Sequence, residues 1–354
     1  MTQIFGYAAQ SASSPLAPFS FERRTPRHDD VAIDILYCGV CHTDIHQARN
    51  EWGVSLYPLV PGHEIVGKIS AVGDGVTRFR VGDRVGVGCL VDSCGRCHAC
   101  TSDQEQYCVE EPTQTYASRD RIDGSVTLGG YSNSIVVKEH FVVRIPDGLD
   151  LASAAPILCA GITTYSPLKR HGLRPGHRIG VLGMGGLGHM GIKYAKALGA
   201  DVTVFTRSPA KAREARKQGA DNVVISSNES EMRSVQGYFD FLLDTIPVQH
   251  DLNPYLETLK FGGVHILVGL IEPITPPVHA ANLVMKGRTL AGSLIGGIAE
   301  TQDVLDFSAE HGITCDIETI DIKNINEAFE RVVAGDVKYR LVIDMASLQN
   351  VGPG

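Results

Sequence analysis

The chain has 354 residues, of which 43% are hydrophobic and 20% are charged. This composition is typical of a globular protein, and the length favours two domains or one domain with a large insertion. A formal net charge of -8 and the lack of a strongly basic segment argue against nucleic acid as a partner. The first residues, MTQIFGYAAQSASS, lack the basic and apolar regions of a signal peptide, so we expect a cytoplasmic protein.

The hydrophobic pattern changes along the chain. Residues 1 to about 150 alternate short apolar runs with glycine and proline, which predicts a mostly β, barrel-like domain. The uncharged segment 151–168 contains two prolines and several hydroxyl residues, and we expect it in the protein interior rather than in a membrane. From about residue 155 strands alternate with helices, which predicts βαβ units and a parallel sheet, so the fold class is α/β. After about residue 295 we expect two helices and a closing strand, YRLVIDM.

The first group of candidate metal ligands lies in YCGVCHTDIH and in the later PGHE. Cys41, His63 and Glu64 are residue types that bind zinc, and they stand at the ends of predicted strands. Cys38 and Cys41 also form a C-x2-C pair that a redox protein could use. Because Cys38 ends an apolar run, we expect it to be packed inside, which leaves Cys41 free to bind metal.

The second group is C-x2-C-x2-C-x7-C, formed by Cys94, Cys97, Cys100 and Cys108. Nine cysteines in a large chain without a signal peptide indicate metal or redox use rather than a disulfide framework. Four thiolates suit a closed, tetrahedral zinc site without a vacancy for substrate, and such a site is structural. An iron–sulfur cluster is an alternative that the spacing leaves open. We expect Cys89 to be a core residue and His98 to face solvent.

A glycine-rich turn follows the first strand of the α/β region. Its sequence is GMGGLG, in which Gly183, Gly185 and Gly188 form G-x-G-x-x-G around Gly186 and Leu187. Because the pattern follows an apolar strand and opens a helix, it predicts a dinucleotide site in which the pyrophosphate meets the helix N-terminus. The alternative, a tight turn that binds nothing, fits poorly with the βαβ units that continue after it.

The end of the next strand distinguishes NAD from NADP. An acidic residue there would bind the ribose 2′-hydroxyl, but the sequence has Thr206, Arg207 and Ser208, and Asp201 stands at the opposite end of the strand. Arg207 between two hydroxyls, with Lys211 one helical turn later, could hold a 2′-phosphate, so we expect NADP(H). For Lys211, a solvated helix face is the competing interpretation.

These motifs together carry a family resemblance. The run G-H-E-x2-G-x5-G-x2-V from Gly62 to Val76 resembles the signature of zinc-containing medium-chain alcohol dehydrogenases, and the four-cysteine and glycine motifs follow in that family's order. YCGVCHTDIH, YPLVPGHE, CAGITTYSPL and GSLIGG are similar to the branch of cinnamyl alcohol dehydrogenases and bacterial NADP-dependent aldehyde reductases. The likeness covers essentially the whole chain. It implies a GroES-like, β-rich catalytic domain from 1–153 and 296–354 and a Rossmann domain from 154–295.

The resemblance also implies roles for residues at the catalytic zinc. Its ligands would be Cys41, His63 and Cys159, with Glu64 able to approach the metal. Asp44 would orient His63. The family reaction moves a hydride between the nicotinamide and a carbonyl carbon, with zinc as the Lewis acid. Thr43 and His46 match the positions of the proton relay, although a surface histidine is the plain alternative for His46. Cys315 has no such support and is expected in the core.

Further positions follow from the same resemblance with less specific motifs. The expected nicotinamide and phosphate contacts are Thr163, Val268, Gly269, Leu270, Ser293, Ile295 and, for phosphate, Arg340. The expected substrate pocket is walled by Trp52, Tyr116 and Ile295. We therefore expect a two-zinc, NADP-dependent aldehyde reductase of aromatic or medium-chain aldehydes that pairs as a homodimer through its Rossmann sheets. The alternatives are a reductase of C=C or C=N bonds with the same fold, and a non-enzymatic, zinc-stapled binding or redox protein.

Overall fold

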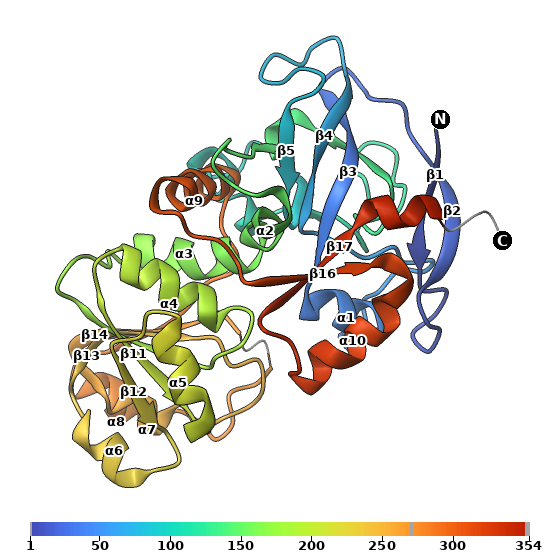
Figure 1. Cartoon of the computed structure of the whole chain (residues 1–354). Coiled ribbons are helices and arrows are strands. Elements are labelled where there is room, and N and C mark those ends of the chain that lie inside the picture. Colours follow the sequence, from blue (N-terminus) through green and yellow to red (C-terminus); the bar gives the residue numbers. More distant parts are fainter. Residues whose placement is uncertain (1, 270–271, 351–354) are drawn as a thin grey trace. The chain divides into compact units, whose positions relative to one another are not determined.

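The structure is a computed structural model that describes residues 2–269 and 272–350 (Figure 1). The chain forms two compact units, Met1–Cys159 with Gly297–Gly354 and Ala160–Gly296. The first boundary falls after Cys159, where the sequence analysis put it after residue 153, because the residues before Cys159 pack against strands of the first unit. Cys159 thereby belongs to the same unit as the other expected zinc ligands.

The first unit is built on a seven-stranded sheet in the order β16-β17-β3-β4-β5-β9, with β8 also pairing with β3. Its strands are β3 (Asp30–Val40), β4 (Ile65–Val72), β5 (Arg84–Val87), β8 (Ser134–Lys138), β9 (Val143–Arg144), β16 (Ile317–Asp321) and β17 (Arg340–Asp344). Two small antiparallel sheets pair β1 (Thr2–Ala8) with β2 (Ala17–Arg23) and β6 (Leu90–Asp92) with β7 (Thr113–Gln114). The expectation of a mostly β region before residue 150 is confirmed.

In the described part of the first unit, the α-helices are α1 (His42–Ala48), α2 (Leu151–Ala154), α9 (Ile298–His311) and α10 (Ile325–Ala334). Short 3-10 helices are η1 (Cys100–Ser102), η2 (Glu105–Tyr107), η3 (Glu139–Phe141), η4 (Ala155–Leu158), η5 (Ile322–Asn324) and η6 (Met345–Asn350). Helix α10 buries Ile325, Ala328 and Phe329, which share one helical face, and it ends at Gly335 with a positive φ of 70°.

The strand register of the first unit brings distant residues to one place. Cys38 pairs with Ile65 across β3 and β4, and Val40 pairs with Leu341 across β3 and β17. The residues just after β3, just before β4 and at the start of β17 therefore meet at one edge of the sheet. These residues are Cys41, His63 and Glu64, and Arg340.

The second unit has a six-stranded parallel sheet in the order β12-β11-β10-β13-β14-β15. Its strands are β10 (Arg178–Leu182), β11 (Asp201–Thr206), β12 (Asn222–Ile225), β13 (Phe239–Asp244), β14 (Leu259–Leu267) and β15 (Thr289–Gly292). Its helices are α3 (Ala160–Arg170), α4 (Gly188–Ala197), α5 (Pro209–Lys217), α6 (Glu229–Ser234), α7 (Asn253–Leu256) and α8 (Ala280–Val284). This is the doubly wound Rossmann order, and α4 and α5 contact its strands (Figure 1). The expected α/β class is confirmed.

Among the described residues, no single helix is both long and apolar enough to cross a membrane. The bent pair Leu151–Leu158 and Ala160–Arg170 meets the length and composition criteria only when its two helices are taken together. Most of its residues are buried in the protein, including Ile157, Ile162 and Leu168.

Candidate active site and metal centres

Four potential zinc ligands meet in the interior of the first unit. Cys41, His63, Glu64 and Cys159 each offer one ligand atom, and these atoms all lie within 4.8 Å of one another. The sulfur atoms of Cys41 and Cys159 are 4.0 Å apart. All four side chains are buried. The structure therefore brings together the residues that the sequence analysis assigned to the catalytic zinc, including the distant Cys159.

The carboxylate of Asp44 forms hydrogen bonds with two of these ligand residues and with their neighbours. Its Oδ1 accepts hydrogen bonds from Gly62 N at 3.0 Å and His63 Nδ1 at 3.1 Å, and its Oδ2 accepts from Cys41 N at 2.9 Å and the Tyr131 hydroxyl at 3.2 Å. Because the carboxylate accepts a hydrogen bond from His63 Nδ1–H, the Nε2 lone pair is left for a metal. Asp44 is fully buried, and α1 brings it here as the third residue after Cys41.

Glu64 and Arg340 form a buried ion pair beside the thiols. The second carboxylate oxygen, Glu64 Oε2, is buried without a hydrogen-bond partner. A Cβ atom at Gly39 would lie 1.9 Å from this oxygen, so glycine is needed there to let the side chain approach. Burial raises the pKa of Glu64 to about 7, against the opposing charge of Arg340. The expected phosphate contact of Arg340 stays a prediction, since its guanidinium faces Glu64.

The chemistry of this group fits zinc. Two thiols, an imidazole and a carboxylate are its common ligands, and an unpartnered buried carboxylate oxygen is costly unless something binds it. A hydrogen bond from Cys159, together with His63, lowers the pKa of Cys41 well below its usual value, which favours the thiolate that metals bind. Cys38 is buried and its thiol points to the Gly39 carbonyl, so a Cys38–Cys41 redox pair is not supported.

The four-cysteine group forms a second potential zinc site. The ligand atoms of Cys94, Cys97, Cys100 and Cys108 also lie within 4.8 Å of one another, and the sulfur atoms of Cys97 and Cys100 are 3.5 Å apart. Backbone N–H groups of Cys100 and Val109 lower the pKa of Cys97 to about 6, as suits a thiolate ligand. His98 is exposed, as expected. Four protein ligands leave no open position, so this site is structural.

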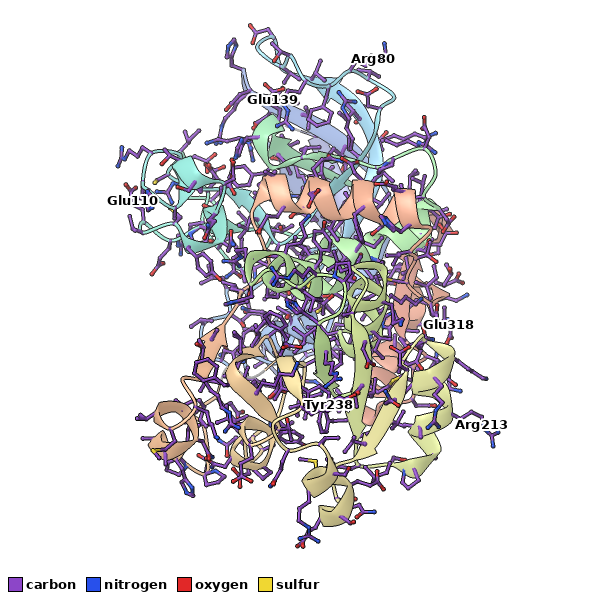
Figure 2. All side chains as sticks on the ribbon, turned by 90° about the vertical axis from the view of Figure 1, so that its left-hand side faces the viewer. Arg80, Glu110, Glu139, Arg213, Tyr238 and Glu318 are labelled. Carbon is purple, nitrogen blue, oxygen red and sulfur yellow. The ribbon has the colours of Figure 1, made fainter. Side chains whose placement is uncertain are left out.

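The four-cysteine lobe, residues 94–108, is tied to the rest of its unit by Glu105. This carboxylate is 1% exposed, faces His140 Nε2 at 2.7 Å and accepts a hydrogen bond from Ile298 N at 3.1 Å, at the start of α9. Just beyond the lobe, Glu110 pairs with Arg96 and Arg121 at the surface (Figure 2). The lobe is thus anchored on its inner side by one buried carboxylate and on its outer side by an exposed one.

The expected relay residues lie on α1. His46 Nδ1 pairs with Glu51, and its ring stacks on Trp52 with 5.0 Å between ring centroids. Glu51 thereby fixes a proton on Nδ1 and leaves Nε2 free to exchange one. Thr43 is half-buried on the same helix. The side chain of Trp52 is 38% exposed.

Tyr116 lies next to the metal ligands. It is buried, and its ring centroid is 5.8 Å from that of His63. Cys89, expected in the core, is only half-buried, and a hydrogen bond with Cys159 lowers its pKa. Both observations place apolar or weakly polar groups around the candidate zinc site, but whether Tyr116 and Trp52 wall a substrate pocket stays a prediction.

In the second unit, the glycine turn links β10 to α4. A Cβ atom at Gly188 would lie 2.3 Å from the Gly183 carbonyl oxygen, whereas one at Gly185 would meet nothing within 4 Å. Gly183 has a positive φ of 91°, which glycine adopts without strain. The turn therefore needs two of its glycines for its own geometry, while the space at Gly185, next to Gly186 and Leu187, is open, as a phosphate approach requires.

Arg207 and Ser208 stand where β11 passes into α5. Arg207 and Lys211 are exposed, Thr206 is buried, and Ser208 occupies the N-cap position of α5 without a side-chain capping bond. Pro209 has no N–H and Lys211 N donates to the Ser208 carbonyl, so the Ser208 hydroxyl, rather than the first N–H groups of the helix, is available to an anion next to Arg207.

The remaining expected cofactor residues are spread over the second unit. Thr163 is buried on α3, and the Ser293 hydroxyl accepts a hydrogen bond from Arg170 at 3.1 Å. Ile295 has a positive φ of 36°, which is strained for a β-branched residue. Val268 and Gly269 donate their N–H groups to the Asp244 carbonyl. Leu270 lies outside the described residues.

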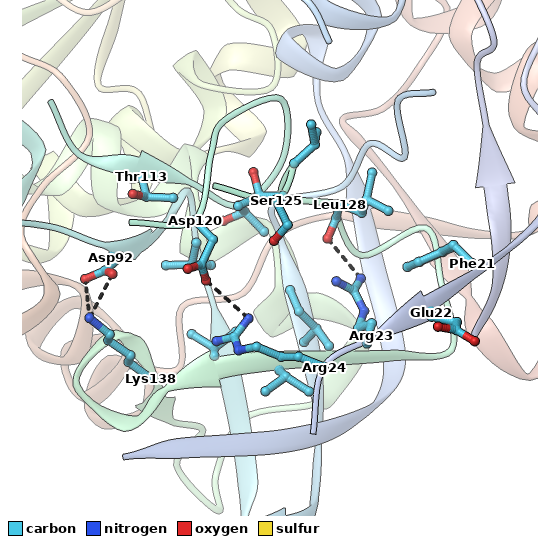
Figure 3. Close-up of a pocket in the computed structure, with 17 residues that line it drawn as sticks. Phe21, Glu22, Arg23, Arg24, Asp92, Thr113, Asp120, Ser125, Leu128 and Lys138 are labelled. Carbon is cyan, nitrogen blue, oxygen red and sulfur yellow. Dashed lines mark hydrogen bonds and ion pairs between the residues drawn. The ribbon is translucent and has the colours of Figure 1, made fainter. Parts of the chain in front are cut away.

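A separate cavity of about 110 Å³ lies in the first unit between β2, β8 and the segment around 113–128 (Figure 3). Two ion pairs lie in its lining: Lys138 with Asp92 at 2.8 Å and Arg24 with Asp120 at 3.6 Å. Arg23 donates to the Leu128 carbonyl at 2.9 Å. Ion pairs and hydrogen bonds hold the walls of the cavity together. None of the candidate zinc ligands lines it.

Three interactions at the site were not foreseen from the sequence. These are the ion pair of Glu64 with Arg340, the hydrogen bond from Tyr131 to Asp44 and the pair of His46 with Glu51. Glu51 is five positions after His46, so local spacing could have indicated it. The first two depend on strand register, and no local signal in the sequence marks them.

Comparison with known proteins gives two matching family models, described as the alcohol dehydrogenase GroES-like domain over residues 27–147 and the zinc-binding dehydrogenase over 186–310. The aldehyde reductase YahK of Escherichia coli is 52% identical over 98% of this chain and 99% of its own. A cinnamyl alcohol dehydrogenase of Sorghum bicolor has a similar structure, with a TM-score of 0.94, 44% identity and 98% of each chain covered. The CAD of Helicobacter pylori in complex with NADP(H) matches with a TM-score of 0.91 and 43% identity, over 98% of this chain and 99% of that one.

Substitution Asp44→Asn should weaken metal binding at Cys41, His63 and Cys159 by about 10- to 100-fold, because an amide nitrogen would face donors that need an acceptor. The measurement is zinc retained per chain during dialysis against graded chelator. Tyr131→Phe removes only one of the four donors and should cause a smaller loss. If Asp44→Asn instead emptied the four-cysteine site first, the role given to Asp44 would be wrong.

Proposed function

The chain belongs to the family of zinc-containing alcohol dehydrogenases, and we propose that it interconverts aldehydes and alcohols with NADP(H), chiefly as an aldehyde reductase. It is an enzyme, and zinc and NADP(H) are its cofactors. The observation that carries the proposal is the buried convergence of Cys41, His63, Glu64 and Cys159. We propose aromatic or medium-chain aldehydes as substrates, and primary alcohols in the reverse direction.

The chemistry of the reaction is divided between bound groups and the protein. When bound, zinc supplies a Lewis acid that polarises the substrate oxygen, and NADP(H) supplies or accepts the hydride. Cys41, His63 and Cys159 would hold the metal, which leaves one coordination position open to substrate. Asp44 keeps the proton of His63 on Nδ1 and so keeps Nε2 directed to the metal.

Proton movement is assigned to α1. The Thr43 hydroxyl can accept one proton while it donates another, which suits it to the inner end of a relay. His46 is partly exposed, and Glu51 holds the proton of its Nδ1, so its Nε2 exchanges protons with solvent. Glu64 would approach the metal with its unpartnered Oε2.

Rival functions use the same fold differently. A reductase of C=C or C=N bonds would have no need for the full set of Cys41, His63, Glu64 and Cys159, which this chain retains and buries together. A non-enzymatic, zinc-stapled binding or redox protein would need only the four-cysteine lobe. A second site in which only Cys41, His63 and Cys159 hold zinc would keep one position open to substrate, and this favours the enzyme.

We propose a homodimer formed through the second unit. Within the described part of the chain, β15 pairs only with β14, so its other edge is open for a partner strand. Phe261, Val284 and Met285 are 85%, 76% and 76% exposed, and Gly262 N bonds to Lys286 O, which places them in one region. Exposed apolar side chains beside an open edge are typical of an interface.

We also propose that the protein works in the cytoplasm. The described cysteines are free thiols, and a reducing compartment keeps thiols available for zinc. A reductase that draws on NADPH would also find its reduced cofactor there.

The purified protein should hold two zinc ions per chain, and Cys159→Ala should lower the content to about one while the fold is kept. Elemental analysis with circular dichroism checks both parts. Cys315→Ala is the matched control, because Cys315 is equally buried but lies outside both metal groups, and it should keep two zinc ions. One zinc in the unmutated protein, or iron in place of zinc, would contradict the assignment.

Arg207→Asp should lower kcat/KM with NADPH by about 100-fold and change the value with NADH far less, because a carboxylate would repel the 2′-phosphate. Steady-state kinetics with an aromatic aldehyde measures both. Arg213→Asp is the control, since Arg213 lies on α5, the helix that follows Arg207, and points into solvent (Figure 2). An unchanged NADPH/NADH ratio in Arg207→Asp would show that Arg207 does not read the 2′-phosphate.

The double substitution Phe261→Asp, Met285→Asp should convert the protein from twice the chain mass to a monomer, since charges at an apolar interface oppose association. Light scattering after gel filtration gives the mass. Val81→Asp, which changes an exposed valine of the first unit, should leave the mass unchanged. A monomeric unmutated protein would refute the dimer.

A further inference from the structure

The second unit contains a buried charged group that the reaction described above does not use. Asp244 ends β13 and is fully buried, and its Oδ2 faces two imidazoles: His250 Nε2 at 2.8 Å and His265 Nε2 at 2.9 Å. His265 is also fully buried, whereas the His250 side chain is 14% exposed. Two imidazoles on one carboxylate raise the question of which of them is charged.

The hydrogen-bond partners of the two rings show that His250 is the charged one. The second ring nitrogen of His250, Nδ1, lies 2.8 Å from the Val248 carbonyl oxygen. A carbonyl and a carboxylate only accept hydrogen bonds, so both nitrogens of His250 must carry protons and the ring is an imidazolium. His265 differs, because its Nδ1 is buried without a hydrogen-bond partner among the described residues, and one proton on Nε2 satisfies its single bond.

The surroundings of His250 support a positive charge. Burial alone would lower the pKa of His250, but the hydrogen bond and charge of Asp244, the Val248 carbonyl and the nearby Asp251 raise it above its usual value. Burial would likewise raise the pKa of Asp244, but the hydrogen bonds from His250 and His265 keep it lowered. A further titratable neighbour is Tyr255, whose ring meets that of His250 edge-on with 6.1 Å between centroids.

This ion pair lies directly behind the cofactor edge of the sheet. The Asp244 backbone carbonyl accepts hydrogen bonds from Val268 N at 3.0 Å and Gly269 N at 3.2 Å. The next residue, Thr245, donates to the Leu182 carbonyl at the end of β10. The strand order reverses between β10 and β13, which is where doubly wound sheets bind dinucleotides.

Packing at this edge is too tight to absorb a shift of Asp244. A Cβ atom at Gly269 would lie 2.6 Å from the Thr245 carbonyl carbon, and one at Gly183 would lie 2.9 Å from Thr245 Oγ1. Gly269 therefore packs against the Thr245 backbone, and the glycine turn packs against the Thr245 side chain. An interaction that fixes the Asp244 side chain therefore also fixes the glycine turn and the segment 268–269, which pack next to residues 244–246.

We propose that His250 is a positioning residue: as an imidazolium it pairs with Asp244 and holds the 244–246 and 268–269 segments in the conformation that binds NADP(H). Loss of its proton leaves the buried carboxylate uncompensated beneath an anionic dinucleotide, so binding weakens. Below the raised pKa of His250 the pair is intact, and as the pH rises through that pKa the pair is lost. By linkage, NADP(H) affinity falls over the same range. This inference rests on the proposed NADP(H)-dependent function.

The first test compares His250→Gln with His265→Gln, since glutamine keeps a hydrogen-bond donor for Asp244 but carries no charge. The dissociation constant of NADPH is measured by its fluorescence from pH 7 to 9.5 in the zinc-loaded enzyme. We expect the unmutated protein and His265→Gln to weaken by about fivefold over this range, and His250→Gln to bind weakly at every pH. A His250→Gln variant that retains the fivefold pH dependence, even with a lower Tm, would reduce His250 to a structural residue and overturn the proposal.

The second test needs no cofactor. Histidine-selective ¹⁵N NMR of the free protein at pH 7 should show two protonated ring nitrogens for the signal missing in His250→Gln, and one for the signal missing in His265→Gln. A single protonated nitrogen on His250 would overturn the proposal. Failure of the unmutated protein to bind NADPH would instead contradict the proposed function, and the NMR result would still decide the charge of His250.

Discussion

The candidate active site depends on the carboxylate of Asp44. Four donors converge on it: the N–H groups of Cys41 and Gly62, the ring of His63 and the hydroxyl of Tyr131. These donors come from segments that flank β3 and β4 and from a loop far along the chain. The buried Asp44 carboxylate thus accepts the hydrogen bonds that water would otherwise accept from these donors. It also fixes the positions of the Cys41 sulfur and the His63 imidazole.

Three of the buried carboxylates, those of Asp44, Asp244 and Glu64, are satisfied in different ways, and the difference fits their roles. Asp44 is saturated by neutral and backbone donors, which makes it a rigid support. Asp244 is compensated by an adjacent imidazolium, so its environment depends on a proton. Glu64 is only half satisfied, since Arg340 pairs with one oxygen and the other has no partner. An incompletely satisfied buried oxygen is costly in a purely structural residue and is expected where a ligand completes the site.

The sequence predicts features whose parts are close together along the chain. The four cysteines, the glycine turn with its helix and the alternation of strands and helices all follow from local spacing, and the structure agrees with each. Cys159 could be assigned only from family resemblance, because its neighbours, PILCAG, look like ordinary core. The pairing of Glu64 with Arg340 spans 276 positions and arises from the register of β17 on β3. Register depends on packing of the whole sheet, and no local pattern encodes it.

The half-buried state of Cys89 has a similar cause. An apolar run predicted a core residue, but the chain at this point borders the metal ligands rather than the sheet interior, so its thiol meets Cys159. The burial of the Cys89 side chain thus depends on its position next to the metal ligands rather than on the hydrophobicity of its neighbours in sequence. The same holds for Tyr131, whose ring is core while its hydroxyl serves the site.

The hydrogen bond that Ile298 N donates to Glu105 connects the four-cysteine lobe to a distant part of the chain. This bond joins residues 193 positions apart, and Ile298 follows directly on Gly297, where the chain re-enters the first unit. A Cβ atom at Gly297 would lie 1.9 Å from the Asp103 carbonyl oxygen, so the lobe and the re-entry point are in backbone contact. The lobe therefore contacts the returning chain directly, so a change in the lobe's conformation would disturb the first turn of α9 as well as the four cysteines.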